Sequence, residues 1–414
     1  MKKLLLLFFT FHFSHFAFSQ GTWSPRSPLP DSAMFQGISG FAIGNYGYAG
    51  LGNYSGANIT FNKFWQFDPS TNSWTRKADF PGKARIAPAS FVIGNKAYLV
   101  TGSVANFGAC VRECWQYDAT NDTWTQKAKF PGTARTYAVG FAIGGKGYVG
   151  AGAAELNDFR KDFFAYDTAT DTWTRIADFG GIARSGASGF TVNGKGYVCL
   201  GQDSTIKYYG DMWEYDTGSN SWTRKANIPD SNASPHLSAS GFAICNNIYI
   251  GCGDDSAFHF SHQFWKYNTV LDTWTQEANV PGITKVQGAA FAIGDTGYYG
   301  FGADSVTQVH NIFDKFFAND SCNSNMGYNI INDISKISVY PNPNNGIFTV
   351  QLSEDNGQSS VEVYNLLGQK INIEMLKKFQ NIYEINFSNQ TSGIYILSIN
   401  LANQIYYKKI IINH

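Results

Sequence analysis

The sequence of 414 residues has little charge, few cysteines and, after its first twenty residues, no long apolar run. Charged side chains make up 15% of the chain, and 31 basic residues balance 31 acidic ones. Overall charge therefore gives no reason to expect binding to nucleic acid or to an anionic membrane. The six cysteines lack paired metal-ligand spacing, and no later segment is apolar enough to span a bilayer.

Glycine and aromatic residues are abundant instead: there are 42 glycines, and aromatic side chains make up 16% of the chain. Glycine adopts the positive φ angles of tight turns without strain. This composition favours an all-β fold with many short strands. The length is enough for two or three domains.

The first 19 residues have the pattern of a signal peptide. Lys2 and Lys3 precede a mostly apolar stretch, and Ala17-Phe18-Ser19 is a small-x-small cleavage site. We expect the mature chain to begin at Gln20. Export permits disulfides, and Cys110 with Cys114 is the pair that we expect.

A repeat of about fifty residues extends to residue 320. It is marked by tryptophans at intervals of 51, 50, 49, 49 and 52 residues, namely Trp23, Trp74, Trp124, Trp173, Trp222 and Trp274. Each unit contains four strand-like segments, of which residues 40–44, 147–152, 64–68 and 73–75 are examples. Four short strands repeated radially make a propeller blade. Cys199 and Cys252 lie within such segments and are expected to be buried thiols.

The number of segments predicts how the ring closes. First and third segments occur six times, but the sixth unit has no fourth segment with its tryptophan. Trp23 precedes the first unit and has no unit of its own. We therefore expect residues 21–30 to complete the sixth blade and to cover its edge.

The unit resembles the kelch repeat in its closing glycines, its aromatic-Asp pair (Phe67-Asp68) and its tryptophan at fixed spacing. The adjacent glycines of that family appear here as Gly-x-Gly, as in Gly50 and Gly52. The resemblance covers residues 21–320. It implies a six-bladed kelch-type β-propeller over residues 20–320, followed by a small C-terminal β-sandwich.

Residues 321–335 are polar and are expected to form a linker to a last domain at 336–414. The ordered set of Pro341-Asn342-Pro343, Gly393-Ile394-Tyr395 and a Lys-Ile strand at 407–412 resembles the type A sorting domain of type IX secretion in Bacteroidota. This implies the type IX machinery as a partner, removal of the domain, and a secreted or outer-surface protein. A plain adhesive β-sandwich is the alternative.

One position, six residues before the first-strand phenylalanine, is basic in five of the six units. It holds Arg85, Arg135, Arg184, His236 and Lys285, with Phe35 in the first unit. By resemblance to kelch propellers, these side chains lie at the mouth of the central channel and bind an anionic ligand. In the alternative, they pair with blade carboxylates such as Asp68, Asp118 and Asp167.

Other polar groups give weaker signals. Asp203, Asp255 and Asp304 follow the second-strand glycine and suit local turns better than a cation site. Asp254, Asp255, His259 and His262 form the sole cluster that resembles metal ligands, and a polar loop explains it. We expect no metal, no cofactor and no catalytic residues.

The sequence favours a binding or adhesion module for an anionic glycan or a protein ligand. The alternative is a propeller carbohydrate-active enzyme, such as a sialic-acid epimerase or a sialidase-like protein. The regular blades and the turns at residues 119–124, which lack the glycine of sialidase turns, disfavour it.

Overall fold

The structure is a computed structural model of the whole chain, which divides into two units, Met1–Asp320 and Ser321–His414, that are described separately. It describes residues 21–30, 37–53, 59–104, 108–154, 158–229, 237–254, 260–282, 286–303, 311–318, 337–352, 360–365, 370–371, 373–379, 381–401 and 404–413. The predicted signal peptide (1–19) and linker (321–335) lie outside these residues.

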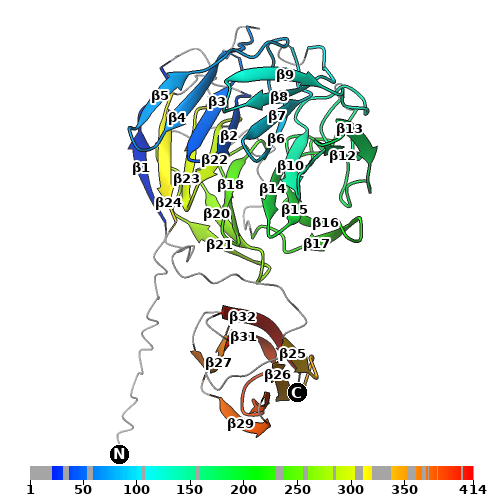
Figure 1. The fold of residues 1–414 in the computed structure, drawn as a ribbon, viewed down its shortest axis with the longest axis vertical. Helices are drawn as coiled ribbons and strands as arrows, with labels where there is room; N and C mark the ends of the chain where they lie inside the picture. The colour runs from blue at the N-terminus through cyan, green and yellow to red at the C-terminus, as the bar shows by residue number, and fades with distance from the viewer. Residues whose placement is uncertain are drawn as a thin grey trace, which may run out of the picture. The chain divides into compact units, whose positions relative to one another are not determined.

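The first unit consists of six antiparallel four-stranded sheets arranged around a centre (Figure 1). Blades one to three are β2 (Ser39–Ile43), β3 (Tyr46–Gly50), β4 (Phe64–Asp68), β5 (Ser73–Arg76); β6 (Ala89–Ile93), β7 (Lys96–Val100), β8 (Cys114–Asp118), β9 (Thr123–Lys127); and β10 (Val139–Ile143), β11 (Lys146–Gly150), β12 (Phe163–Asp167), β13 (Thr172–Arg175). The other three are β14 (Ser188–Val192), β15 (Lys195–Cys199), β16 (Met212–Asp216), β17 (Ser221–Lys225); β18 (Ser240–Ile244), β19 (Asn247–Gly251), β20 (Phe264–Asn268), β21 (Thr273–Glu277); and β22 (Ala289–Ile293), β23 (Thr296–Gly300), β24 (Phe313–Phe317), β1 (Thr22–Arg26). The predicted all-β, six-bladed propeller is confirmed.

Glycines in the second strands let neighbouring blades pack closely. A Cβ atom added to Gly147 would lie 2.1 Å from the ring of Phe91 in the preceding blade. The same holds for Gly196 against Phe141, at 2.3 Å. At four of the six interfaces the first-strand phenylalanine therefore fills the space that a glycine leaves open, whereas Ala97 and Ile248 stand at the equivalent positions of blades two and five.

The fourth-strand tryptophans join the blades at the periphery. Each indole N–H donates to a backbone carbonyl of the preceding blade, over 2.8–3.3 Å. The pairs are Trp74–Ser27, Trp124–Ala78, Trp173–Ala128, Trp222–Ala177, Trp274–Ala226 and Trp23–Ala278. These six bonds form a closed outer ring, because the last pair joins the sixth blade to the fifth.

The sixth blade takes its outer strand from the N-terminus. Strand β1 pairs antiparallel with β24, with Trp23 opposite Phe316. The Trp23 ring also packs edge-on against Phe264 of the fifth blade, at 5.0 Å between centroids. The backbone N–H of Gly21 donates to Glu277 of that blade over 2.8 Å. The N-terminal strand thus makes contacts in two blades.

The second unit contains two four-stranded sheets. One has the order β25 (Ile337–Tyr340), β26 (Ile347–Leu352), β30 (Ile382–Asn386), β29 (Glu374–Phe379), and the other β28 (Lys370–Ile371), β27 (Ser360–Asn365), β31 (Gly393–Leu401), β32 (Gln404–Ile412). Alternating side chains such as Phe348, Val350 and Leu397 form its buried core.

The cysteines correct one prediction. Neither Cys110 nor Cys114 is disulfide-bonded, so the expected bond between them is wrong. Cys199 and Cys252 are buried thiols, as predicted. Cys245 is disulfide-bonded.

We expect Trp23→Ala to lower the free energy of unfolding of the propeller by about 3 kcal/mol, because it removes a large aromatic side chain and one bond of the outer ring. Thermal and denaturant unfolding of the mature protein would measure this loss. Thr22→Ala, at an exposed position of the same strand, is the control and should change stability little. A Trp23→Ala protein that unfolds like the parent would contradict closure by this strand.

Candidate ligand site at the channel mouth

A ring of backbone hydrogen bonds encircles the channel just before the first strands. Its members are Gly37, Ala87, Tyr137, Gly186, Ser238 and Gln287, and each N–H donates to the carbonyl of the equivalent residue in the preceding blade over 3.0–3.4 Å. All six have φ between +45° and +67°. We call this set the αL ring. Its left-handed conformation turns each chain sharply into the channel.

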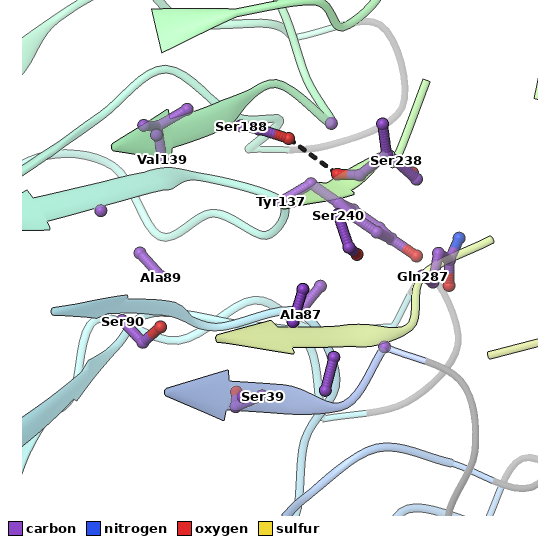
Figure 2. Close-up of a pocket in the computed structure, with 18 of the residues that line it drawn as sticks. Ser39, Ala87, Ala89, Ser90, Tyr137, Val139, Ser188, Ser238, Ser240 and Gln287 are labelled. Carbon is purple, nitrogen blue, oxygen red and sulfur yellow. Dashed lines mark hydrogen bonds between the residues drawn. The ribbon is translucent and has the colours of Figure 1, made fainter. Parts of the chain in front are cut away.

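The channel below this ring is narrow. The first strands line a cavity of about 210 Å³ (Figure 2). The hydroxyls of Ser188 and Ser240 donate to backbone carbonyls of the next blade, at 2.7 and 2.8 Å. The buried Ser39 hydroxyl has no partner among the described residues. The described residues that line the channel thus present mostly small side chains and backbone, and Tyr137 is the one titratable group among them.

A larger cavity of about 780 Å³ opens at the channel mouth, on the face of the loops between second and third strands. We call it the mouth pocket. Its lining combines hydroxyl and amide groups with apolar side chains, among them Thr136, Tyr137, Ser185, Gln202, Phe159 and Gln287. Such a mixture suits a ligand with both polar and apolar surfaces.

Two carboxylates line the mouth pocket, and both have partners. Asp158 forms an ion pair with Arg160. Asp203 accepts hydrogen bonds from the hydroxyl of Tyr209 and from the hydroxyl and backbone N–H of Thr205, at 2.6–2.8 Å. Burial raises the pKa of Asp203, but these bonds outweigh it and lower the pKa to about 2. Asp203 therefore stays ionised and stabilises its own loop, as the sequence suggested.

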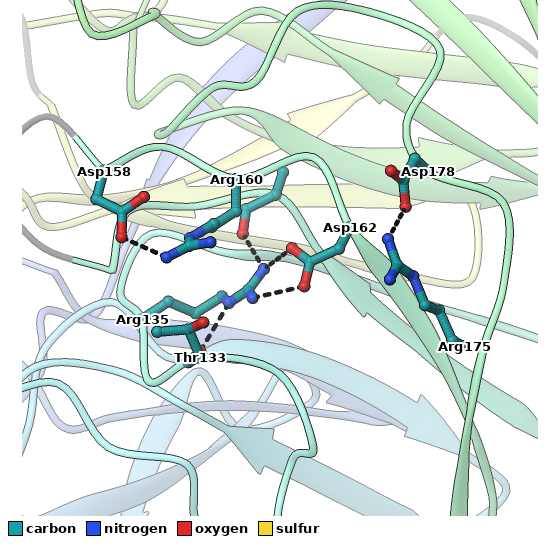
Figure 3. Close-up of polar contacts among 8 residues, drawn as sticks. Thr133, Arg135, Asp158, Arg160, Asp162, Arg175 and Asp178 are labelled. Atoms are coloured by element: carbon teal, nitrogen blue, oxygen red, sulfur yellow. Dashed lines mark hydrogen bonds and ion pairs between the residues drawn. The ribbon is translucent and has the colours of Figure 1, made fainter.

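The structure places the predicted site residue Arg135 inside blade three, beneath the surface (Figure 3). Its guanidinium donates to both oxygens of Asp162, at 2.7 and 2.9 Å, and to the carbonyl of Ala151 at 3.0 Å. The ring of Phe130 lies 4.9 Å from it. Burial raises the pKa of Asp162, but Arg135 outweighs this effect and holds the pKa below its ordinary value.

Arg85 and Arg184 repeat this arrangement in blades two and four. They form ion pairs with Glu113 and Asp211, and both arginines are at most 1% exposed. Each guanidinium also donates to the carbonyl that follows its second strand, over 3.0 Å. In these three blades the geometry supports the structural alternative, because each charge is neutralised within the blade.

The partners are not the carboxylates that the sequence suggested. Asp68, Asp118 and Asp167 instead accept bonds from backbone N–H groups of the following turn, at 2.8–3.0 Å. The sequence does contain a signal for the true partners. An acid directly precedes the third strand in the three blades that carry arginine, and Lys63, Gln263 and Ile312 stand there in the others.

Less can be said of the remaining residues that the sequence singled out as site candidates. His236, Lys285, Asp255, His259 and Asp304 lie outside the described residues. His262 contacts the carbonyl of Val280 through its Nδ1 atom, at 3.1 Å. Within the described part of the chain, no group of three or more His, Cys, Asp or Glu side chains could hold a metal ion.

Comparison with known families agrees with this architecture. The model of the KLHDC2/KLHL20/DRC7 kelch-repeats domain matches residues 37–253 and again residues 88–302, one blade further along. The chain belongs to the kelch-repeat family. A solved structure titled "Structure of YjhT" is similar over 72% of this chain and 97% of its own, with a TM-score of 0.60 and 16% identity. No curated protein matches the chain.

The C-terminal unit of this kelch protein matches the model of a secretion system C-terminal sorting domain over residues 338–413. The predicted type IX sorting domain is therefore confirmed, and with it a secreted or cell-surface location. The described residues contain no helix long and apolar enough to cross a membrane.

We expect Arg135→Met to lower the free energy of unfolding by about 2–3 kcal/mol at neutral pH, because Asp162 would lose its charge partner. The pair stabilises the fold above the ordinary pKa of an aspartate, about 3.9, and this contribution is lost as pH falls through the lower folded pKa. The deficit of the variant should therefore shrink below about pH 4.

Melting curves of the parent and Arg135→Met between pH 3 and pH 7 test this expectation. The double change Arg135→Met with Asp162→Leu should recover part of the loss, since it removes both charges. Equal melting temperatures of parent and Arg135→Met at pH 7 would indicate that the pair contributes nothing.

Proposed function

We propose that the mature propeller is an extracellular binding module whose ligand lies in the mouth pocket. The observation that carries this proposal is the cavity of about 780 Å³ at the loop-bearing end of a rigid channel. Long loops held by a rigid scaffold are where binding usually resides. The volume also falls within the usual range for small-molecule sites.

The walls of the mouth pocket support binding of a glycan or a polar segment of a protein. Hydroxyl and amide groups such as those of Ser185 and Gln202 can donate and accept, and Phe159 offers an apolar surface. The basic ring gives weaker support. Arg85, Arg135 and Arg184 already bind carboxylates of their own blades, so anion binding at this ring stays a prediction.

The binding proposal is tested by filling the mouth pocket. Ser204 is exposed and lines it, so Ser204→Trp should obstruct the pocket without disturbing the core. The control is Ala169→Trp, at an exposed position in the turn between β12 and β13 on the opposite face. Mature protein would be screened against glycans and surface polymers, and every ligand found would be measured with both variants.

We expect Ser204→Trp to weaken binding at least tenfold and Ala169→Trp to leave it unchanged. Equal binding by the parent and Ser204→Trp would place the ligand elsewhere. Absence of binding to any glycan, surface polymer or surface protein would overturn the proposal itself.

A second prediction concerns maturation. We expect the exported protein to begin near Gln20 and to end before about Ile337, because a signal peptide and a sorting domain are removed at the two ends. Mass spectrometry of protein from the native medium or cell surface would measure both termini. Finding His414 on most surface-exposed molecules would contradict removal of the C-terminal domain.

A further inference from the structure

The αL ring is regular in its backbone but not in its side chains. In four blades the side chain is absent or small, as in Gly37, Ala87, Gly186 and Ser238. The large side chains are Tyr137 in blade three and Gln287 in blade six. Blades three and six face each other across a six-membered ring, so these two side chains can meet over the channel.

Tyr137 and Gln287 separate two cavities. Both residues line the mouth pocket, and both also line the channel cavity. Figure 2 shows the tyrosine side chain extending from its blade with the hydroxyl directed at Gln287. Gly186 and Ser238 line both cavities as well, so the two large side chains form part of the floor of the mouth pocket and of the roof of the channel. A ligand that enters the mouth pocket as far as possible ends against these two side chains.

This floor has unused hydrogen-bonding capacity. The Gln287 side chain lies beside the Tyr137 hydroxyl. Its Oε1 atom is nevertheless buried with no partner among the described residues, and so is the hydroxyl of Thr136, a residue that is only 6% exposed. Thr136 lines the same pocket. Buried polar groups in folded proteins are nearly always paired, and these two belong to residues that line one cavity, so a ligand there can supply the missing partners.

The charges around the pocket indicate what that ligand is. Asp158 and Asp203 line its wall as carboxylates, and none of the described lining residues is basic. A carboxylate or phosphate ligand would meet two carboxylates there, and Arg160, the cation that pairs with Asp158, is already engaged by it. The unpaired Oε1 atom requires a donor, and a hydroxyl group can donate to it while it accepts from a neighbour.

We propose that Tyr137 and Gln287 recognise the terminal hydroxyl groups of an uncharged saccharide that enters the mouth pocket end-on. This inference rests on the proposed function and adds to it the class of ligand and the residues that decide its specificity. The pair also sets how deep the ligand reaches, because the blades with Gly37 and Gly186 leave that space open.

The test uses the mature protein and isothermal titration calorimetry. The probes are cellobiose, mannobiose and galactobiose, with digalacturonate as the charged counterpart. The variants are Tyr137→Phe, which keeps the ring without the hydroxyl, and Gln287→Met, which keeps the length without the amide. Tyr46→Phe, at an exposed tyrosine on the opposite face, is the matched control.

We expect at least one uncharged disaccharide to bind more tightly than digalacturonate. Tyr137→Phe and Gln287→Met should each weaken it about fivefold, the usual effect of one lost neutral hydrogen bond. Tyr46→Phe should bind like the parent. Unchanged melting temperatures of the variants would show that the effect arises in the site.

The outcomes separate this inference from the proposed function. Preference for digalacturonate, or a ligand that is not a saccharide but is blocked by Ser204→Trp, would overturn the inference alone. The inference alone also fails if Ser204→Trp abolishes disaccharide binding while Tyr137→Phe and Gln287→Met bind like the parent. A mature protein that binds no ligand of any class would overturn both.

Discussion

Six backbone amides at the channel mouth each donate to the carbonyl of the preceding blade, and the last bond returns to the first blade. Without these partners, the innermost polar groups of every sheet would depend on water in the channel for their hydrogen bonds. The bonds hold the six first strands at one level. They also oblige residues such as Tyr137 and Gln287 to take a left-handed conformation. The backbone thus decides where the channel mouth is, and the side chains decide what it can contact.

The indole bonds at the periphery complement this inner ring. Both rings have one bond per blade interface, and both include the interface next to the N-terminal strand. Between them, at four of the six interfaces, the phenylalanine side chains of first strands fill the slots left by glycines of the next blade. Because every interface has one bond of each ring, and four of the six also have the glycine slot, the stability of each blade depends on its neighbours. A site at the channel mouth is consequently held in place by the contacts between all six blades.

Much of the fold could be predicted from the sequence, since a tryptophan every fifty residues reports directly on the number of blades. The spare Trp23 also indicated which strand lies beside β24. The site was harder to predict from the sequence than the fold. Equal spacing of Arg85, Arg135 and Arg184 shows that they occupy equivalent positions but not whether the guanidinium points to solvent or into the blade. Only the acidic residue directly before the third strand of the same blade indicates that the guanidinium points into the blade.

The mouth pocket could not be predicted at all, because its polar groups come from several blades and share no motif. Tyr137 and Gln287 are separated by 150 residues in the sequence, and only their shared place in the repeat, four residues before the first-strand phenylalanine, relates them. What places them together is the αL conformation, and in the sequence it is suggested only by glycine at positions 37 and 186.

The pairing of β1 with β24 has a consequence for the order in which the molecule assembles. Trp23 precedes the other five blades in the chain, yet its partner strand ends nearly 300 residues later, at Phe317. Contacts of such long range form slowly, and an unpaired strand edge is open to wrong partners in the meantime. The ring cannot close before the last blade is complete. Strand β1 is therefore the first strand of the propeller to be made and the last to pair.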